Sequence, residues 1–234
     1  MNTLYDRNGL VFWTEKEIKL RNTFVSYFVD EIKSVLKMQN KAFELHQIEA
    51  PLLTPVEFIN KNYTPDDYYT ASDKDLGHAD LVLRPETTMG SYQYANWVLS
   101  HTETKTKLPI CVWQHGKSFR KEQDQVTKNM RLKEFYQLEF QCIYGLTTQN
   151  DYSLEVIPTV CLMISEFIGP CRIENSDRVP DYSEKTIDIV CEKSNMEVCS
   201  ISVRNDFPGA KVLEIAIGTD RCVYNFLEKK ILPS

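Results

Sequence analysis

The chain has 234 residues, enough for one large domain or two small ones at about 100–200 residues per domain. Hydrophobic residues make up 42% of it and charged residues 26%, which excludes a disordered or collagen-like chain. With 27 Lys and Arg against 33 Asp and Glu, the net charge is −6. Proteins that bind nucleic acid mainly by neutralising phosphates are usually basic, so any nucleic-acid contact here must be local.

Apolar runs such as residues 160–164 fall far short of the ~20 residues that span a bilayer, and residues 1–6 lack the features of a signal peptide. We therefore expect a cytoplasmic protein with no membrane contact. The seven cysteines occur without a CxxC pair, as expected for buried thiols in a reducing compartment. A zinc site at Cys111 and His115 is an alternative, although no second pair of ligands completes a tetrahedron.

The first half of the chain begins with a predicted helix. Thr14 and Glu17 form a capping-box pattern, and apolar residues then recur at helical spacing, which predicts a helix over 14–38. This helix is longer than a small domain needs, so part of it should pack on another element or chain. Next we expect a strand over 43–53, a loop over 60–80, a short strand or turn over 81–86 and a helix over 88–100.

The second half mixes strands and helices. Strands over 109–115 and 132–144 form a candidate hairpin with a long tip at 123–129. A helix over 152–168 contains Pro158, which is expected to kink or interrupt it. Strands over 186–191, 196–203 and 211–217 precede a helix over 219–230. Without a linker or a βαβ rhythm, residues 1–234 read as one α+β domain, an antiparallel sheet flanked by helices.

Clusters of opposite charge interrupt otherwise apolar segments. They are Arg84/Glu86, Arg120/Glu122, Arg131/Glu134/Glu139 and Glu214/Asp220/Arg221. Taken singly, each cluster reads as a solvated face. Strand alternation, however, places Phe135, Gln137 and Glu139 on one face, so an aromatic ring and a carboxylate lie in line there. Arginines near such a face would suit an anionic ligand with an aromatic ring, such as a nucleotide.

Three segments together resemble a known family. Residues 118–122 (SFRKE), a loop, and residues 131–135 (RLKEF) resemble motif 2 of class II aminoacyl-tRNA synthetases, which has an FRxE strand and an RxxxF strand. Ala50-Pro51 after the long helix resembles motif 1, and residues 214–221 (EIAIGTDR) resemble motif 3. The order of the motifs is that of the family. The resemblance therefore implies the class II antiparallel catalytic fold.

Within that family the resemblance is greatest to glycyl-tRNA synthetase. Residues 83–90 (LRPETTMG) resemble its RPETAQG motif, and residues 114–120 (QHGKSFR) resemble its QIGxxFR segment. Residues 181–183 and 188–189, and then Glu197 with residues 204–207, loosely resemble its later segments. The resemblance covers roughly residues 9–228.

The resemblance implies a site for ATP and Mg²⁺. Its ATP-binding residues would be Arg120, Glu122, Arg131, Phe135, Glu197 and Arg221, of which Arg120 and Arg221 are the catalytic ones. Arg120 would contact the α-phosphate of ATP. Negative charge develops there as the carboxylate of the amino acid attacks ATP and pyrophosphate leaves. Arg131 would hold the γ-phosphate, and Glu197 would help bind Mg²⁺. Phe135 and Arg221 would sandwich the adenine, whose amino group would donate to Glu122.

The resemblance also implies an amino-acid site. Its residues would be Arg84, Glu86, Gln137, Glu139, Glu214 and Ala216. The carboxylates of Glu86, Glu139 and Glu214 would bind the ammonium group, with glycine favoured as the amino acid. The chain departs from the family in two places. Ala216 stands where the family has a serine. Residues 123–128 replace the proline, the arginine and the glycine that are usual in the motif 2 loop.

The partners implied are a tRNA acceptor end and a second copy of the chain. The chain ends soon after motif 3, where the family continues into an anticodon-binding domain, so we expect that domain to be lacking. Six lysines near the motif 2 hairpin would form an acceptor-stem patch or be dispersed solubility residues: Lys105, Lys107, Lys117, Lys121, Lys128 and Lys133. Motif 1 implies a homodimer.

Three functions remain open at this point. The chain activates an amino acid with ATP and charges a tRNA; or it transfers the activated amino acid to a protein or small molecule; or it is a non-catalytic accessory subunit. Several charged residues that would be costly to bury without a ligand favour the first two.

Overall fold

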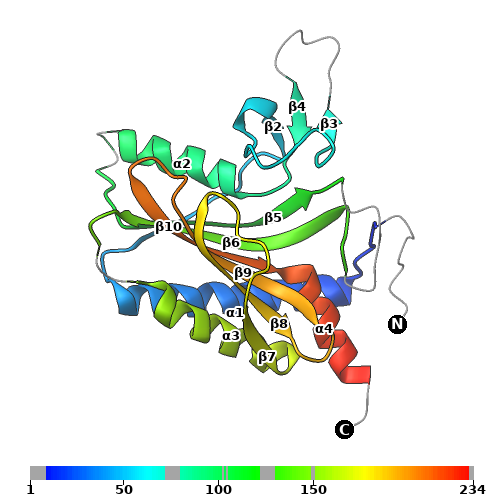
Figure 1. Cartoon of the computed structure of the whole chain (residues 1–234). Helices are drawn as coiled ribbons and strands as arrows, with labels where there is room; N and C mark the ends of the chain where they lie inside the picture. Colours follow the sequence, from blue (N-terminus) through cyan, green and yellow to red (C-terminus); the bar gives the residue numbers. More distant parts are fainter. Residues whose placement is uncertain are drawn as a thin grey trace.

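The computed structural model describes residues 9–71, 80–101, 103, 105–121, 130–148 and 151–231, with side chains through Glu228. A seven-stranded sheet forms the centre (Figure 1). Helices α1 (Glu15–Gln39), α3 (Ser153–Ile168) and α4 (Thr219–Ile231) cover one face of it. Helix α2 (Thr88–Ser100) lies over one end of the other face. The rest of that second face borders a cavity.

The strand order in the large sheet is β1-β5-β6-β10-β9-β8-β7. Its members are β1 (Glu44–Gln47), β5 (Ile110–Phe119), β6 (Glu134–Gly145), β7 (Cys171–Asn175), β8 (Ser183–Cys191), β9 (Met196–Arg204) and β10 (Ala210–Gly218). Within the described ranges every pair in this sheet is antiparallel except β1 with β5. The predicted α+β class, with an antiparallel sheet flanked by helices, is confirmed.

The long first helix is confirmed to within one residue at each end. Thr14 and Glu17 form the predicted capping box, in which the backbone N–H of Thr14 donates to the Glu17 carboxylate at 2.9 Å. Phe24, Phe28 and Ile32 recur at intervals of four residues and are buried against the sheet. The helix is therefore amphipathic because its apolar side chains share one stripe.

The strand predicted over 43–53 is wrong in its second half. Strand β1 ends at Gln47, and the chain then enters a separate three-stranded sheet of order β2-β4-β3. That sheet contains β2 (Leu53–Pro55), β4 (Leu81–Leu83) and β3 (Thr70–Ala71). Pro51 lies between the two strands, where its missing N–H makes a continuous ladder unfavourable.

Two further elements differ from expectation. Pro158 does not interrupt α3, because it lies in the second turn and removes only one hydrogen bond along the helix. Edge strand β7 was not predicted, since its sequence, CRIEN, is short and largely exposed. The hairpin of β5 and β6 is confirmed from Phe119↔Glu134 to Ile110↔Ile143, while its tip at 123–129 lies outside the described residues.

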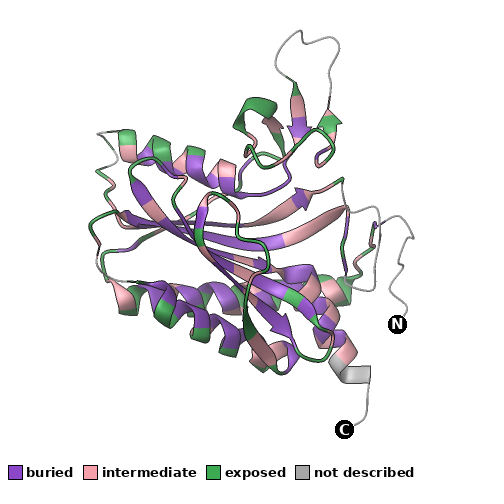
Figure 2. Cartoon of the chain, viewed as in Figure 1, coloured by how far each residue is buried: buried purple, intermediate pink, exposed green. Residues whose placement is uncertain are grey.

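The two faces of the large sheet differ in chemistry. Strand β10 illustrates this, since Leu213, Ile215 and Ile217 pack into the core beneath α1, α3 and α4, whereas Glu214 and Ala216 alternate onto the cavity face. Figure 2 shows the buried layer between sheet and helices and the exposed outer faces of the helices. All seven cysteines are free thiols, and all but Cys171 are buried, as predicted. None of the described helices combines the length and the apolar character needed to cross a bilayer.

Candidate active site

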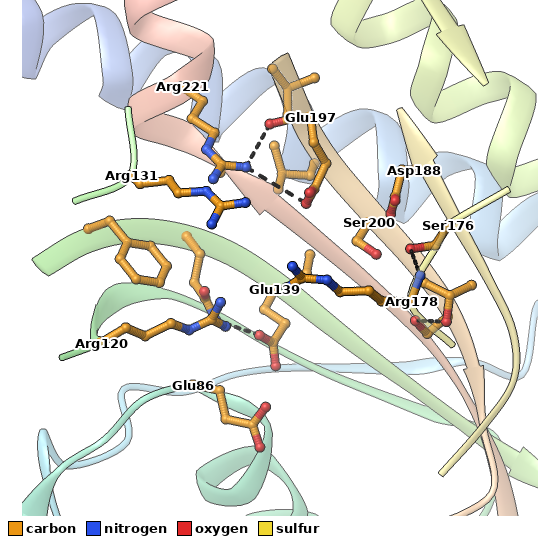
Figure 3. Close-up of a pocket in the computed structure, with 18 of the residues that line it drawn as sticks. Glu86, Arg120, Arg131, Glu139, Ser176, Arg178, Asp188, Glu197, Ser200 and Arg221 are labelled. Atoms are coloured by element: carbon orange, nitrogen blue, oxygen red, sulfur yellow. Dashed lines mark hydrogen bonds and ion pairs between the residues drawn. The ribbon is translucent and has the colours of Figure 1, made fainter. Parts of the chain in front are cut away.

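A cavity of about 950 Å³ lies over the polar face of β6, β10, β9 and β8 (Figure 3). It is lined by ten of the twelve residues predicted for the site: Glu86, Arg120, Arg131, Phe135, Gln137, Glu139, Glu197, Glu214, Ala216 and Arg221. Strand pairing explains how residues so far apart in sequence meet. Glu139 pairs with Ala216, Ala216 with Ser200 and Ser200 with Asp188, so one row of the sheet runs along the cavity.

Three carboxylates form what we call the acidic floor: Glu86, Glu139 and Glu214. Burial, with the nearby Glu214 as a second cause, raises the pKa of Glu139 to about 7. Burial likewise raises the pKa of Glu86 to about 7, although the positive charge of Arg204 opposes this rise. Two of the carboxyls are thus only partly ionised near neutral pH. A cation bound among them would favour their ionised forms.

Neutral side chains hold the acidic floor in place. The amide of Gln141 donates to Glu139 and to Glu214, each at 2.7 Å, and the amide of Gln137 donates to Glu139 at 2.6 Å. Oε1 of Glu86 is buried and has no hydrogen-bond partner among the described residues. A buried acceptor without a partner is costly. The floor therefore retains acceptor capacity for a ligand that donates hydrogen bonds.

Arg204 belongs to the site although no role was predicted for it. Its guanidinium is only 1% exposed and donates to Glu214 at 2.6 Å and to Asp206 at 2.7 Å. It also lies 4.0 Å from the centre of the Tyr182 ring. An arginine within an apolar strand was the available signal, since such a charge is buried only when paired. Arg204 compensates part of the negative charge of the acidic floor.

Three arginines that we call the basic rim, Arg120, Arg131 and Arg221, line the same cavity (Figure 3). The guanidinium of Arg120 lies 5.3 Å from the ring centre of Phe135, and its Nε donates to the carbonyl of Pro85 at 3.2 Å. Arg221 donates to the backbone carbonyl of Glu197 at 2.8 Å. Together with the acidic floor, the basic rim gives one cavity both carboxylates that can bind a cation and guanidinium groups that can bind an anion.

The structure places Arg84 away from the cavity lining, contrary to its predicted contact with the amino acid. Its guanidinium donates to the carbonyl of Ala50 at 2.7 Å, to the carbonyl of Lys117 at 2.8 Å and to the side chain of Gln114 at 3.2 Å. It therefore joins the segment after β1 to β5, a structural role. Glu122, predicted to contact adenine, lies outside the described residues.

The donor set fits magnesium held partly by phosphates better than zinc held by the protein. Nowhere in the described ranges do three or more His, Cys, Asp or Glu residues gather as a metal site. Cys111 is buried beside Cys142, which leaves the zinc alternative without support. The half-exposed carboxylate of Glu197 lines the cavity, 3.7 Å from Arg221. One such carboxylate suits Mg²⁺, which usually takes one or two carboxylates plus substrate phosphates.

Comparison with known proteins agrees with this geometry. Residues 69–219 match the family model described as tRNA synthetase class II core domain (G, H, P, S and T). A glycine--tRNA ligase of Mycoplasmopsis synoviae (strain 53) is 30% identical over 154 residues, which cover 57% of this chain and 34% of that protein. One of Mycoplasma mycoides subsp. mycoides SC is 31% identical over 138 residues, covering 54% of this chain and 29% of that protein. The chain thus matches about a third of the length of these relatives.

A solved structure extends the comparison to the fold. The prolyl-tRNA synthetase of Cryptosporidium parvum, solved with halofuginone and AMPPNP, superposes with a TM-score of 0.70 at 16% identity. The match covers 95% of this chain and 48% of that one. The family model spans more than half of the chain, and the fold agrees with it. The chain therefore belongs to the family of class II aminoacyl-tRNA synthetase core domains.

Proposed function

We propose that the chain activates an amino acid with ATP, forming an aminoacyl adenylate and releasing pyrophosphate. The observation that carries this proposal is the presence of the acidic floor and the basic rim in one cavity. An amino acid brings an ammonium group that suits buried carboxylates, and ATP brings phosphates that suit arginines. The reaction requires the two ligands side by side, which a single cavity with both kinds of charge provides.

In this proposal the chain acts by positioning and by electrostatic stabilisation. Arg120 binds the α-phosphate, and its fixed charge stabilises the negative charge that develops there when the carboxylate attacks. Phe135 and Arg221 bind the two faces of the adenine, and Arg131 binds the γ-phosphate. Glu197 would hold Mg²⁺, which when bound neutralises charge on the triphosphate. The acidic floor binds and orients the ammonium group.

We further propose glycine as the amino acid and a tRNA acceptor end as the recipient. Support comes from the relatives, two of which are named glycine--tRNA ligase. Glycine has no side chain to recognise, so its selection would depend on excluding larger residues near Ala216, which lines the cavity. A homodimer and a cytoplasmic location stay predictions of the same proposal.

Amino-acid-dependent exchange of pyrophosphate into ATP, measured with each of the twenty amino acids, tests the activity. We expect exchange with glycine, and Arg120→Ala should lower it by ~10²-fold or more because a transition-state contact is lost. Arg172→Ala is a matched control, since Arg172 lies on β7 outside the cavity lining and pairs with Glu174. If no amino acid supports exchange at any Mg²⁺ concentration, the catalytic proposal is wrong.

The recipient needs a separate experiment. Charging of deacylated tRNA would support aminoacylation of an acceptor end. Exchange without tRNA charging, but with labelling of a carrier protein or a small amine, would assign the activated amino acid to another recipient.

A further inference from the structure

Arg178 is a fourth arginine of the cavity, and neither the motifs nor the proposed roles above account for it. It lies in the loop between β7 and β8, at residues 176–182, and it lines the cavity together with the basic rim. Figure 3 shows its side chain extending from this loop into the cavity, opposite the side from which Arg120 enters. Within the described residues its guanidinium takes part in no ion pair.

The loop that carries Arg178 is attached at both ends. Ser176 accepts a hydrogen bond from the backbone N–H of Arg178 at 3.3 Å, and its own N–H donates to the carbonyl of Thr186 at 3.0 Å. At the other end, the carbonyl of Tyr182 accepts from the N–H of Asn205 at 2.9 Å. The Tyr182 end of the loop lies next to the acidic floor, because its ring packs on Arg204, which is paired with Glu214.

The charges in the cavity leave one substrate group without a partner. An amino acid carries a carboxylate as well as an ammonium group, and this carboxylate must lie between the acidic floor and the α-phosphate of ATP. Both neighbours are negative, so an unpartnered carboxylate would be repelled there. Arg204 is already paired with Glu214 and Asp206, and Arg120 is assigned to the α-phosphate. Of the four arginines in the described cavity lining, the three of the basic rim have assigned roles. Arg178 is the one that is left to bind this carboxylate.

We propose that Arg178 binds the carboxylate of the amino-acid substrate, an inference that rests on the proposed function. A planar guanidinium can donate two parallel hydrogen bonds to a carboxylate, which orients it as well as neutralising it. During activation one carboxylate oxygen forms a bond to the α-phosphorus while the bond from that phosphorus to the pyrophosphate oxygen breaks. Pyrophosphate leaves with the electron pair. Arg178 holds the other oxygen, which becomes the carbonyl oxygen of the adenylate.

Exchange kinetics of Arg178→Ala and Arg178→Lys test this assignment with the amino acid that best supports exchange. We expect the alanine variant to raise the KM for the amino acid by about 10- to 100-fold, because a charge-assisted hydrogen bond is lost. The KM for ATP should stay within about threefold of wild type. The lysine variant keeps the charge without the planar fork, so its effect should be intermediate. Arg172→Ala is again the matched control.

The carboxamide of the same amino acid separates binding from a structural effect. It keeps the ammonium group but has no carboxylate, so its inhibition constant should change by less than about threefold in Arg178→Ala. An unchanged KM for the amino acid would overturn the assignment. Equal weakening of amino acid and amide, or a raised KM for ATP alone, would overturn it too, in favour of a structural or a phosphate-binding role. No exchange by the wild type would instead refute the proposed function on which the assignment rests.

Discussion

Glu139→Gln removes one carboxylate of the acidic floor and leaves a side chain of the same shape. The pKa of Glu139 rises from 4.5 to about 7 on folding, mainly through burial. Because the folded value lies above the unfolded one, the stability that the protonated carboxyl contributes is fully present below pH 4.5 and is lost as the pH rises to about 7. The ligand-free variant should therefore be more stable than wild type at pH 8 and not at pH 5.

The size of the effect follows from that pKa. At about 1.4 kcal/mol per pH unit, ionising Glu139 costs the folded protein about 3 kcal/mol. The glutamine must place an NH₂ group where the carboxylate accepts from the amides of Gln137 and Gln141, so at least one hydrogen bond worth about 1 kcal/mol is lost. The net gain is about 2 kcal/mol at pH 8. At pH 5 part of the ionisation cost, about 1 kcal/mol, is still present, so it nearly cancels the lost hydrogen bond and the net effect is close to zero.

Urea unfolding followed by tryptophan fluorescence at pH 5, 6, 7 and 8 measures how this gain in unfolding free energy grows with pH. Glu184→Gln is the control, since Glu184 on β8 is 44% exposed and pairs with Lys211 at 2.9 Å. A surface pair of this kind contributes about 1 kcal/mol or less, so the control should follow wild type across the range. If the difference in unfolding free energy between Glu139→Gln and wild type is the same at pH 5 and pH 8, the electrostatic account of the acidic floor is wrong.

Three further variants test other contacts. In Gly116→Ala the new methyl would clash with Nη2 of buried Arg84, so urea unfolding should report a loss of about 1–3 kcal/mol, and unchanged stability would contradict the packing. Phe135→Ala should raise the KM for ATP in the exchange assay by about tenfold or more through the lost adenine stack, whereas an unaltered KM would remove the ring from the nucleotide site. Asp220→Ala leaves buried Arg21, 3.2 Å from the lost carboxylate, without its ion-pair partner. Its unfolding free energy should fall by about 3–5 kcal/mol, and a fall below about 1 kcal/mol would argue against a buried pair.

Local patterns in the sequence were enough to predict the helices and most strands. The apolar spacing and the capping box predicted α1 to within one residue at each end, and α2 was predicted at the bounds observed, 88–100. The order of the three motifs identified the class II family before any strand was paired. These features could be read from the chain because each depends on residues that are near neighbours along it.

The tertiary structure decided what each charged residue contacts. Arg84 stands in a family motif, yet its donors reach the carbonyls of Ala50 and Lys117, which lie 34 and 33 residues away. Arg204 and Arg178 had no predicted role. Pairing of β9 with β10 brings Arg204 to the acidic floor, and the path of the β7–β8 loop brings Arg178 into the cavity lining. The energy of a charge depends on its burial and its partners, and both are set by contacts between distant segments.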